Sequence, residues 1–203
     1  MNMSKHGELT AEIGKNLKLE GYDVFYDHGE PSPSVGKIVS SIDKAPAMGE
    51  ELSRLDIAII KKTTNKAVAL IEIEETTDTP KTFLGDIFGI LMGKSISFKG
   101  NSSGWKIGNW TTLIIIGNGK NHEKRNEHIR EMALKAKSAF GTQNSKIGNI
   151  VIEAFSDREK LPSLLLSVLD RAFKDERWES LQQADITRAR AKARSWGPGN
   201  LRR

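Results

Sequence analysis

Two short apolar runs carry acidic residues at positions where a buried strand is normally apolar. The first run, Leu55–Ile60, contains Asp56, and the second, Val68–Glu75, contains Glu72 and Glu74. Both runs have the composition of strands buried in a sheet. A buried carboxylate costs free energy unless it is paired or binds a metal ion. The runs therefore predict a core β-hairpin whose acidic side chains bind a divalent cation.

The spacing of these acids predicts that they share one patch. Alternation along a strand places Leu70, Glu72 and Glu74 on one face. If the two runs pair, Asp56 at the start of the first strand lies near Glu72 and Glu74. Three oxygen donors suit Mg²⁺, with Mn²⁺ as a substitute. Such an ion lowers the pKa of a bound water, orients it and stabilises a scissile phosphate, as phosphodiester hydrolysis requires.

The rest of the pattern predicts a mixed α/β fold, with helices on both faces of one sheet. We expect helices at residues 5–20, 80–92, 122–140 and 161–178, and strands at 22–26, 55–62, 67–74, 110–116 and 147–155. Gly21 is expected to end the first helix. Residues 28–50 contain three prolines and predict a long loop or insertion with a short strand at 37–41. Residues 99–109, rich in Gly, Asn and Ser, predict a second loop.

Positive charge is concentrated at the C-terminal end. The net charge is +5, and the 18 residues after Asp185 carry +6 with no acid, which leaves −1 for the remainder. Such a cluster is an electrostatic footprint for phosphates; a solvated terminus with a chance charge excess is the alternative. We therefore divide the chain into a domain at 1–180, with its insertion at 28–50, and a basic tail at 181–203.

Several side chains are candidate contacts to nucleic acid. Met48 lies in a loop before the Asp56 run and is a candidate wedge between bases, with packing or simple exposure as the alternative. Trp196, in the tail, has no obvious core to join. The full set is Lys44, Met48, Lys94, Lys120, Arg188, Arg190, Lys192, Arg194 and Trp196.

Composition excludes several other classes. The chain has no cysteine, so it has no disulfide, zinc-thiolate site or thiol nucleophile. No apolar run reaches the ~20 residues of a membrane span, and the N-terminus has no apolar signal region. Gly117–Lys120 lacks the full phosphate-loop pattern, so we expect no nucleotide cofactor. These features predict a soluble, cytoplasmic protein without a membrane partner.

The acidic motif resembles that of the PD-(D/E)xK nuclease superfamily. Asp56, fifteen intervening residues and then Glu72-Ile73-Glu74 match its aspartate and the acid two residues before its third position. The helix containing Glu12, followed by Gly21-Tyr22 and a strand, is similar to the opening of archaeal Holliday-junction resolvases and many restriction endonucleases. A glutamate on that helix often faces their active site. The resemblance covers about residues 5–140 and implies a restriction-endonuclease-like αβββαβ core.

One position departs from the family pattern. The superfamily usually has lysine where this chain has Glu74, although a minority of restriction enzymes carry glutamate there and remain active. A lysine on a neighbouring helix, Lys81 or Lys94, is a second source of the missing charge. Loss of the lysine also allows an inactive descendant that only binds DNA.

The resemblance implies a Mg²⁺-dependent endodeoxyribonuclease. Asp56 and Glu72 would bind the metal, Glu74 would serve as ligand or water-positioning base, and Glu12 would bind or orient a second metal. In-line attack by water would leave a 5′-phosphate. Chain length and the E-x-E variant favour a type II restriction endonuclease, and a structure-selective, resolvase-like enzyme follows closely. Both classes usually act on DNA as homodimers, because two strands need two active sites.

Two further interpretations stay open at this level. Glu72 and Glu74 would be ordinary surface residues if they lay on the wet face of an edge strand and paired with Lys61 or Lys62. The chain would then be a soluble α/β interaction protein. The apolar character of both runs argues instead for a central hairpin.

Overall fold

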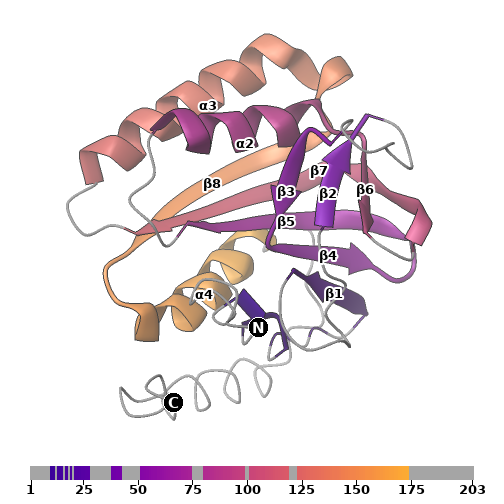
Figure 1. Cartoon of the computed structure of the whole chain (residues 1–203), viewed down its shortest axis with the longest axis horizontal. Helices are drawn as coiled ribbons and strands as arrows, with labels where there is room; N and C mark the ends of the chain where they lie inside the picture. The colour runs from indigo at the N-terminus through magenta and orange to yellow at the C-terminus, as the bar shows by residue number, and fades with distance from the viewer. Residues whose placement is uncertain are drawn as a thin grey trace.

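The computed structural model describes residues 10–11, 13–15, 17, 19, 21–27, 38–42, 51–74, 80–98, 101–118 and 123–173. They form one eight-stranded sheet with helices on both faces, which confirms the predicted mixed α/β class (Figure 1). The strands are β1 (Tyr22–Tyr26), β2 (Ile38–Ser41), β3 (Ser53–Leu55), β4 (Ile57–Lys61), β5 (Lys66–Glu74), β6 (Ser95–Phe98), β7 (Asn101–Asn118) and β8 (Ile147–Phe155). The helices are α2 (Pro80–Met92), α3 (Glu123–Asn144) and α4 (Leu161–Phe173), with a 3₁₀ turn η1 (Arg158–Lys160) before α4. Residues 10–11 and 13–15 are also helical.

The sheet has strands of mixed orientation, in the order β1-β4-β5-β7-β6-β2-β3, and β8 pairs with the second half of β7. β1, β4 and β5 are antiparallel neighbours, whereas β7 is parallel to β5 and β8 is parallel to β7. Because β5 lies between β4 and β7, the edge-strand alternative for Glu72 and Glu74 is wrong. Lys62, one of its proposed partners, instead forms an ion pair with Asp23 at 3.3 Å.

Each face of the sheet has its own hydrophobic core. Ala58, Ile60 and Leu70 pack beneath α2 and α3. The alternate positions Ile59 and Ile71 pack on the other face, with Ile13 and α4. Strand alternation after Leu70 therefore directs Glu72 and Glu74 to the face that α2 and α3 cover.

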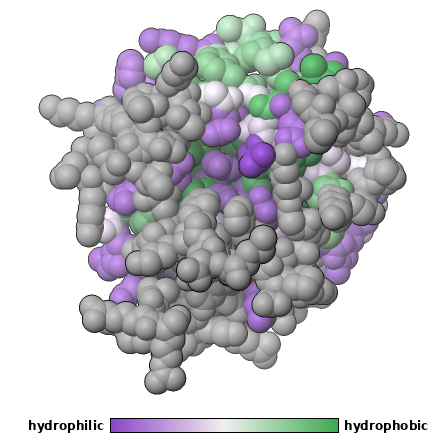
Figure 2. Space-filling model, viewed as in Figure 1, coloured by the Kyte–Doolittle hydropathy of each residue, from purple (hydrophilic) through white to green (hydrophobic). Residues whose placement is uncertain are grey.

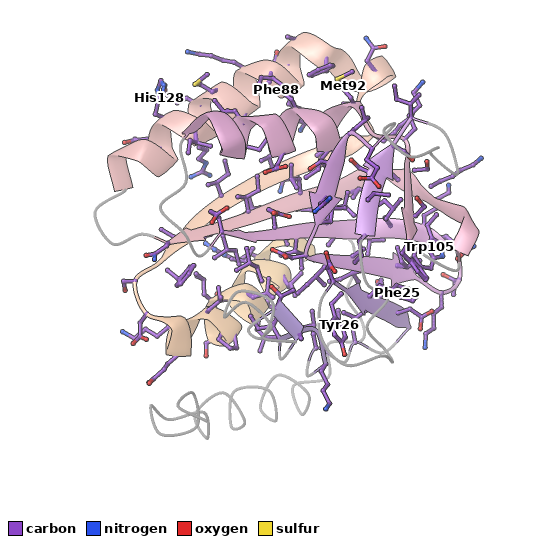
Figure 3. All side chains as sticks on the ribbon, viewed as in Figure 1. Phe25, Tyr26, Phe88, Met92, Trp105 and His128 are labelled. Carbon is purple, nitrogen blue, oxygen red and sulfur yellow. The ribbon has the colours of Figure 1, made fainter. Side chains whose placement is uncertain are left out.

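The sheet curls so that distant parts of its strand order meet. β3 is the last strand of the order, yet Asp56 alone separates it from β4. The ring of Phe25 in β1 stacks on Phe98 of β6, with ring centroids 5.3 Å apart, and meets the tilted ring of Trp105 in β7 at 4.3 Å. Figure 3 shows Phe25 and Trp105 close together at this end of the sheet. Trp105 is 8% exposed, so it anchors this part of the core.

Two sequence predictions are corrected by strand pairing. Residues 101–109 are not a loop, because they form the first half of β7 and pair with β6, with Trp105 opposite Ile96. Burial of Trp105 and this pairing outweigh the loop-like composition. Residues 55–62 are not one strand either, because the chain changes partners at Asp56.

Among the described residues, the other predicted strands and the helices at 80–92 and 122–140 agree with the structure to within a few residues at their ends. The hairpin β4–β5 is antiparallel, with Ile57 opposite Ile71, and β2 occupies most of the short strand predicted inside the insertion. The prediction that Gly21 ends the first helix is wrong, because residues 17 and 19 are not helical; Gly21, with a φ of +79°, instead lies in a turn that the Tyr22 N–H closes on the Leu19 carbonyl at 3.2 Å. No helix in the described ranges is long and apolar enough to cross a membrane.

Candidate functional site

Asp56 ends the β4–β5 ladder with its own side chain. Its residue is 4% exposed, and its backbone N–H donates to the Ile71 carbonyl at 3.2 Å. Its Oδ2 accepts a 2.7 Å hydrogen bond from the Ile73 N–H. If the ladder of Ile57 with Ile71 continued, the carbonyl of Leu55 would accept that bond. The carboxylate replaces the carbonyl, and the chain can turn into β3.

This geometry predicts different effects for two substitutions at Asp56. Asp56→Ala leaves the buried Ile73 N–H without its acceptor and should lower the free energy of unfolding by about 1–3 kcal/mol. Asp56→Asn keeps an acceptor oxygen and should cost clearly less. Urea denaturation of both variants checks this prediction, and equal losses would show that the hydrogen bond contributes little.

Glu72 lies across the hairpin from Asp56 and carries the least favourable environment among the described carboxyl groups. The residue is half-buried, but its Oε2 is buried and has no hydrogen-bond partner among the described residues. Burial raises the pKa of the Glu72 carboxyl well above its ordinary value, and the charges of Asp56, Asp86 and Glu74 raise it further. The nearby backbone N–H of Asp56 opposes this shift only in part. The Glu72 carboxyl is therefore stabilised either by binding a proton or by binding a cation.

Asp86 is a member of this site that the sequence reasoning missed. It lies on α2, and its Oδ1 accepts a 3.1 Å hydrogen bond from the Ser53 Oγ of β3. Its charge acts on Glu72 from the helix that covers this face of the sheet. A signal was present, because Asp86 is the one acidic residue in the otherwise largely apolar segment Pro80–Met92. We call Asp56, Glu72, Glu74 and Asp86 the carboxylate cluster.

The carboxylate cluster has the chemistry of a hard-cation site. All of its side-chain donors are carboxylate oxygens, and one of them, the Glu72 Oε2, is buried without a hydrogen-bond partner in the described part of the chain. Mg²⁺ prefers such ligands and completes its shell with water. Within the described part of the chain, no three Asp, Glu, His or Cys side chains are placed to enclose an ion. Asp56 and Glu72 of the predicted ligands are nevertheless neighbours, so these two residues fit a cation that also keeps several waters.

Comparison with known proteins adds no identification. Protein-family models, curated proteins and solved structures gave no match to this chain. The carboxylate cluster and the strand order therefore carry the functional argument.

Of the other predicted site residues, Glu74 is a half-buried member of the carboxylate cluster, whereas Lys94 lies away from the cluster. Lys94 is exposed, and its backbone pairs with Ser41 and Ile107. Ile107 is next to Ala67 on β5. Ala67 lies five residues before Glu72, a separation of about 17 Å along the strand at about 3.3 Å per residue.

The other predictions fall outside the described residues or side chains. These are Glu12, the side chain of Lys81, and the nucleic-acid candidates Lys44, Met48, Lys120, Arg188, Arg190, Lys192, Arg194 and Trp196.

Proposed function

We propose that this protein is a metal-dependent endodeoxyribonuclease of the PD-(D/E)xK type. The observation that carries the proposal is the proximity of the Asp56 carboxyl, at a strand junction, to the Glu72 carboxyl on β5. The Glu72 Oε2 is buried with no hydrogen-bond partner among the described residues, in a cluster of carboxyl groups that repel one another. A divalent cation would relieve both the repulsion and the missing contact.

The order of elements supports the αβββαβ core of this superfamily. The helical residues 10–11 and 13–15 are followed by the antiparallel strands β1, β4 and β5, then by α2, and then by β7 parallel to β5. In this reading, β2 and β3 form an insertion between β1 and β4, and β6 is an addition before β7.

In the proposed mechanism, Asp56 and Glu72 would hold Mg²⁺, and Glu12 would bind or orient a second ion. Such an ion would make a nearby water more acidic and stabilise charge on the phosphate. Glu74, at the usual lysine position, would orient the attacking water and accept its proton. The water oxygen would form a bond to phosphorus as the bond to the 3′-oxygen breaks, the 3′-oxygen would take a proton from solvent, and the product would keep a 5′-phosphate.

Among enzymes of this type, we favour a cytoplasmic type II restriction endonuclease that acts on duplex DNA as a homodimer. The basic tail would contact the phosphate backbone. A structure-selective, resolvase-like nuclease is the alternative. The glutamate at the lysine position also supports a second candidate, a DNA-binding module of the same fold without cleavage activity.

The decisive experiment incubates purified protein with supercoiled plasmid and genomic DNA in Mg²⁺, Mn²⁺ or EDTA. We expect metal-dependent cleavage that falls about a thousandfold in Asp56→Asn, because a lost ligand removes several kcal/mol of transition-state stabilisation. Discrete fragments support a restriction enzyme, and a preference for branched DNA supports a resolvase-like one. Salt-sensitive binding without cleavage of any of these DNAs would reject catalysis in favour of the binding module.

A further inference from the structure

The outer face of α2 and α3 exposes apolar side chains that the fold leaves uncovered by other described residues. Phe88 and Met92 of α2 are 38% and 41% exposed, and Leu134 of α3 is 45% exposed. Together with exposed Gly85, the α2 residues form an uncharged stripe at helical spacing. The two helices are in contact, and the rings of Phe88 and Phe140 lie 6.4 Å apart. Hydrophobic residues also gather over the helical layer, at the top of Figure 2.

The charges beside this apolar stripe have both signs. α3 exposes Glu127 and Glu131 together with Arg130 and Lys135. A phosphate backbone would meet the two glutamates, so this face suits nucleic acid poorly. A twofold contact requires a surface that is complementary to itself, and acids and bases on one helix meet that condition when two copies pair.

We propose that the outer face of α2 and α3 is the surface through which two copies of this chain associate. This inference deepens the proposed function, because it places the homodimer contact on the side of α2 that faces away from the carboxylate cluster. Phe88 and Met92 lie on this helical layer, far from Phe25 and Trp105 (Figure 3). The cluster of each copy then stays on the sheet side of α2, clear of the contact.

The size of the face predicts a reversible dimer. α2 has 13 residues and α3 has 22. At about 1.5 Å per residue and about 10 Å per helix, the face measures about 500 Å² in each copy. Two such faces bury about 1,000 Å², which is near the lower limit for a specific interface, so we expect the dimer to be weak and reversible.

Sedimentation equilibrium of the full chain without DNA tests the inference. The weight-average mass of the wild-type protein should rise from 22.5 kDa toward twice that mass as its concentration increases. Met92→Lys and Leu134→Lys should each weaken dimerisation at least tenfold, because each replaces an exposed apolar side chain of the proposed contact, on α2 and on α3 respectively, by a charge in both copies. Ser167→Lys adds the same charge to an exposed position of α4, on the other face of the sheet, and should leave it unchanged.

Circular dichroism establishes that each variant is folded, and both replaced side chains on the helical face are exposed. A wild-type protein that stays monomeric at all concentrations overturns the inference, as does a dimer that both helix variants leave intact. Cleavage takes no part in this measurement. A dimer without nuclease activity would reject the proposed function alone, and an active monomer would reject the interface alone.

Discussion

Glu72→Gln is expected to stabilise the folded protein at neutral pH and to abolish its metal binding. Glutamine keeps the size of the side chain but removes a charge that lies among three other carboxyl groups. We expect the free energy of unfolding near pH 7 to rise by about 1 kcal/mol or more, because glutamine has no charge for burial and the neighbouring carboxyl groups to disfavour. DNA cleavage should fall about a thousandfold at the same time.

The pH dependence of this effect follows from the direction of the pKa shift. The Glu72 pKa is raised above its ordinary value of 4.5, so the folded state holds this proton more tightly than the unfolded state does. Its contribution to stability is complete below about pH 4.5 and is lost as pH rises through the raised pKa. Wild-type protein should therefore lose stability across that interval, and Glu72→Gln should lose less.

Thermal unfolding from about pH 4 to about pH 8, with and without Mg²⁺, measures both effects. Mg²⁺ should raise the melting temperature of wild-type protein and leave that of Glu72→Gln unchanged, because a ligand that binds only the folded state stabilises it. Glu159→Gln, at an exposed position, is the matched control and should change little. A neutral-pH melting temperature below that of wild type would contradict the proposed electrostatic strain at Glu72.

Gly89→Ala should be the most destabilising single-methyl substitution on α2. A Cβ at Gly89 would lie 2.3 Å from the Leu52 carbonyl oxygen and 2.8 Å from the Ser53 Cβ. The oxygen belongs to the backbone, and the Leu52 N–H is itself bonded to the Ser40 carbonyl at 3.0 Å, so this segment cannot rotate aside. α2 would have to move away from the chain before β3 by about 1 Å, which breaks close packing.

We expect this variant to lose about 2–4 kcal/mol of stability, even though alanine favours a helix over glycine by about 1 kcal/mol. For a chain of this size, the melting temperature should fall by about 5–15 °C. Cleavage should also weaken, because the same movement separates Asp86 from Ser53, its hydrogen-bond donor.

Gly85→Ala is the control on the same helix. Nothing lies within 4 Å of its added Cβ, so this substitution should stabilise by about 0.5–1 kcal/mol through helix propensity alone. Chemical denaturation of the two variants at one protein concentration gives the comparison. Equal effects of both substitutions would mean that α2 does not pack on Leu52 as closely as described.

The hairpin and its acids were predictable because they are local. Alternation along residues 68–74 predicts the shared face of Leu70, Glu72 and Glu74, and the short connection predicts the antiparallel partner. The structure confirms that hairpin and the approach of Asp56 to Glu72. The apolar character of both runs also correctly predicted that β5 is internal.

Contacts between segments that are distant in the sequence are harder to predict from it. Asp86 joins the carboxylate cluster because α2 packs over β3 and β5. The residue spacing within α2 does not indicate which strands the helix covers. The first half of β7 was mistaken for a loop because its composition is loop-like and its partner β6 is short. At Asp56 the strand changes partners, and the residue type alone cannot distinguish a hydrogen-bonding acid from a metal ligand.

The amino-acid sequence alone determined the α/β class, the order of most elements and the positions of Asp56, Glu72 and Glu74, since these follow from hydrophobic periodicity over short segments. Tertiary structure alone decided that the sheet curls at Asp56, that Asp86 faces Glu72 and that the Glu72 Oε2 is buried without a described partner. The physical reason is that desolvation and charge repulsion depend on which segments are in contact. Those contacts are set by the packing of the entire sheet against its helices.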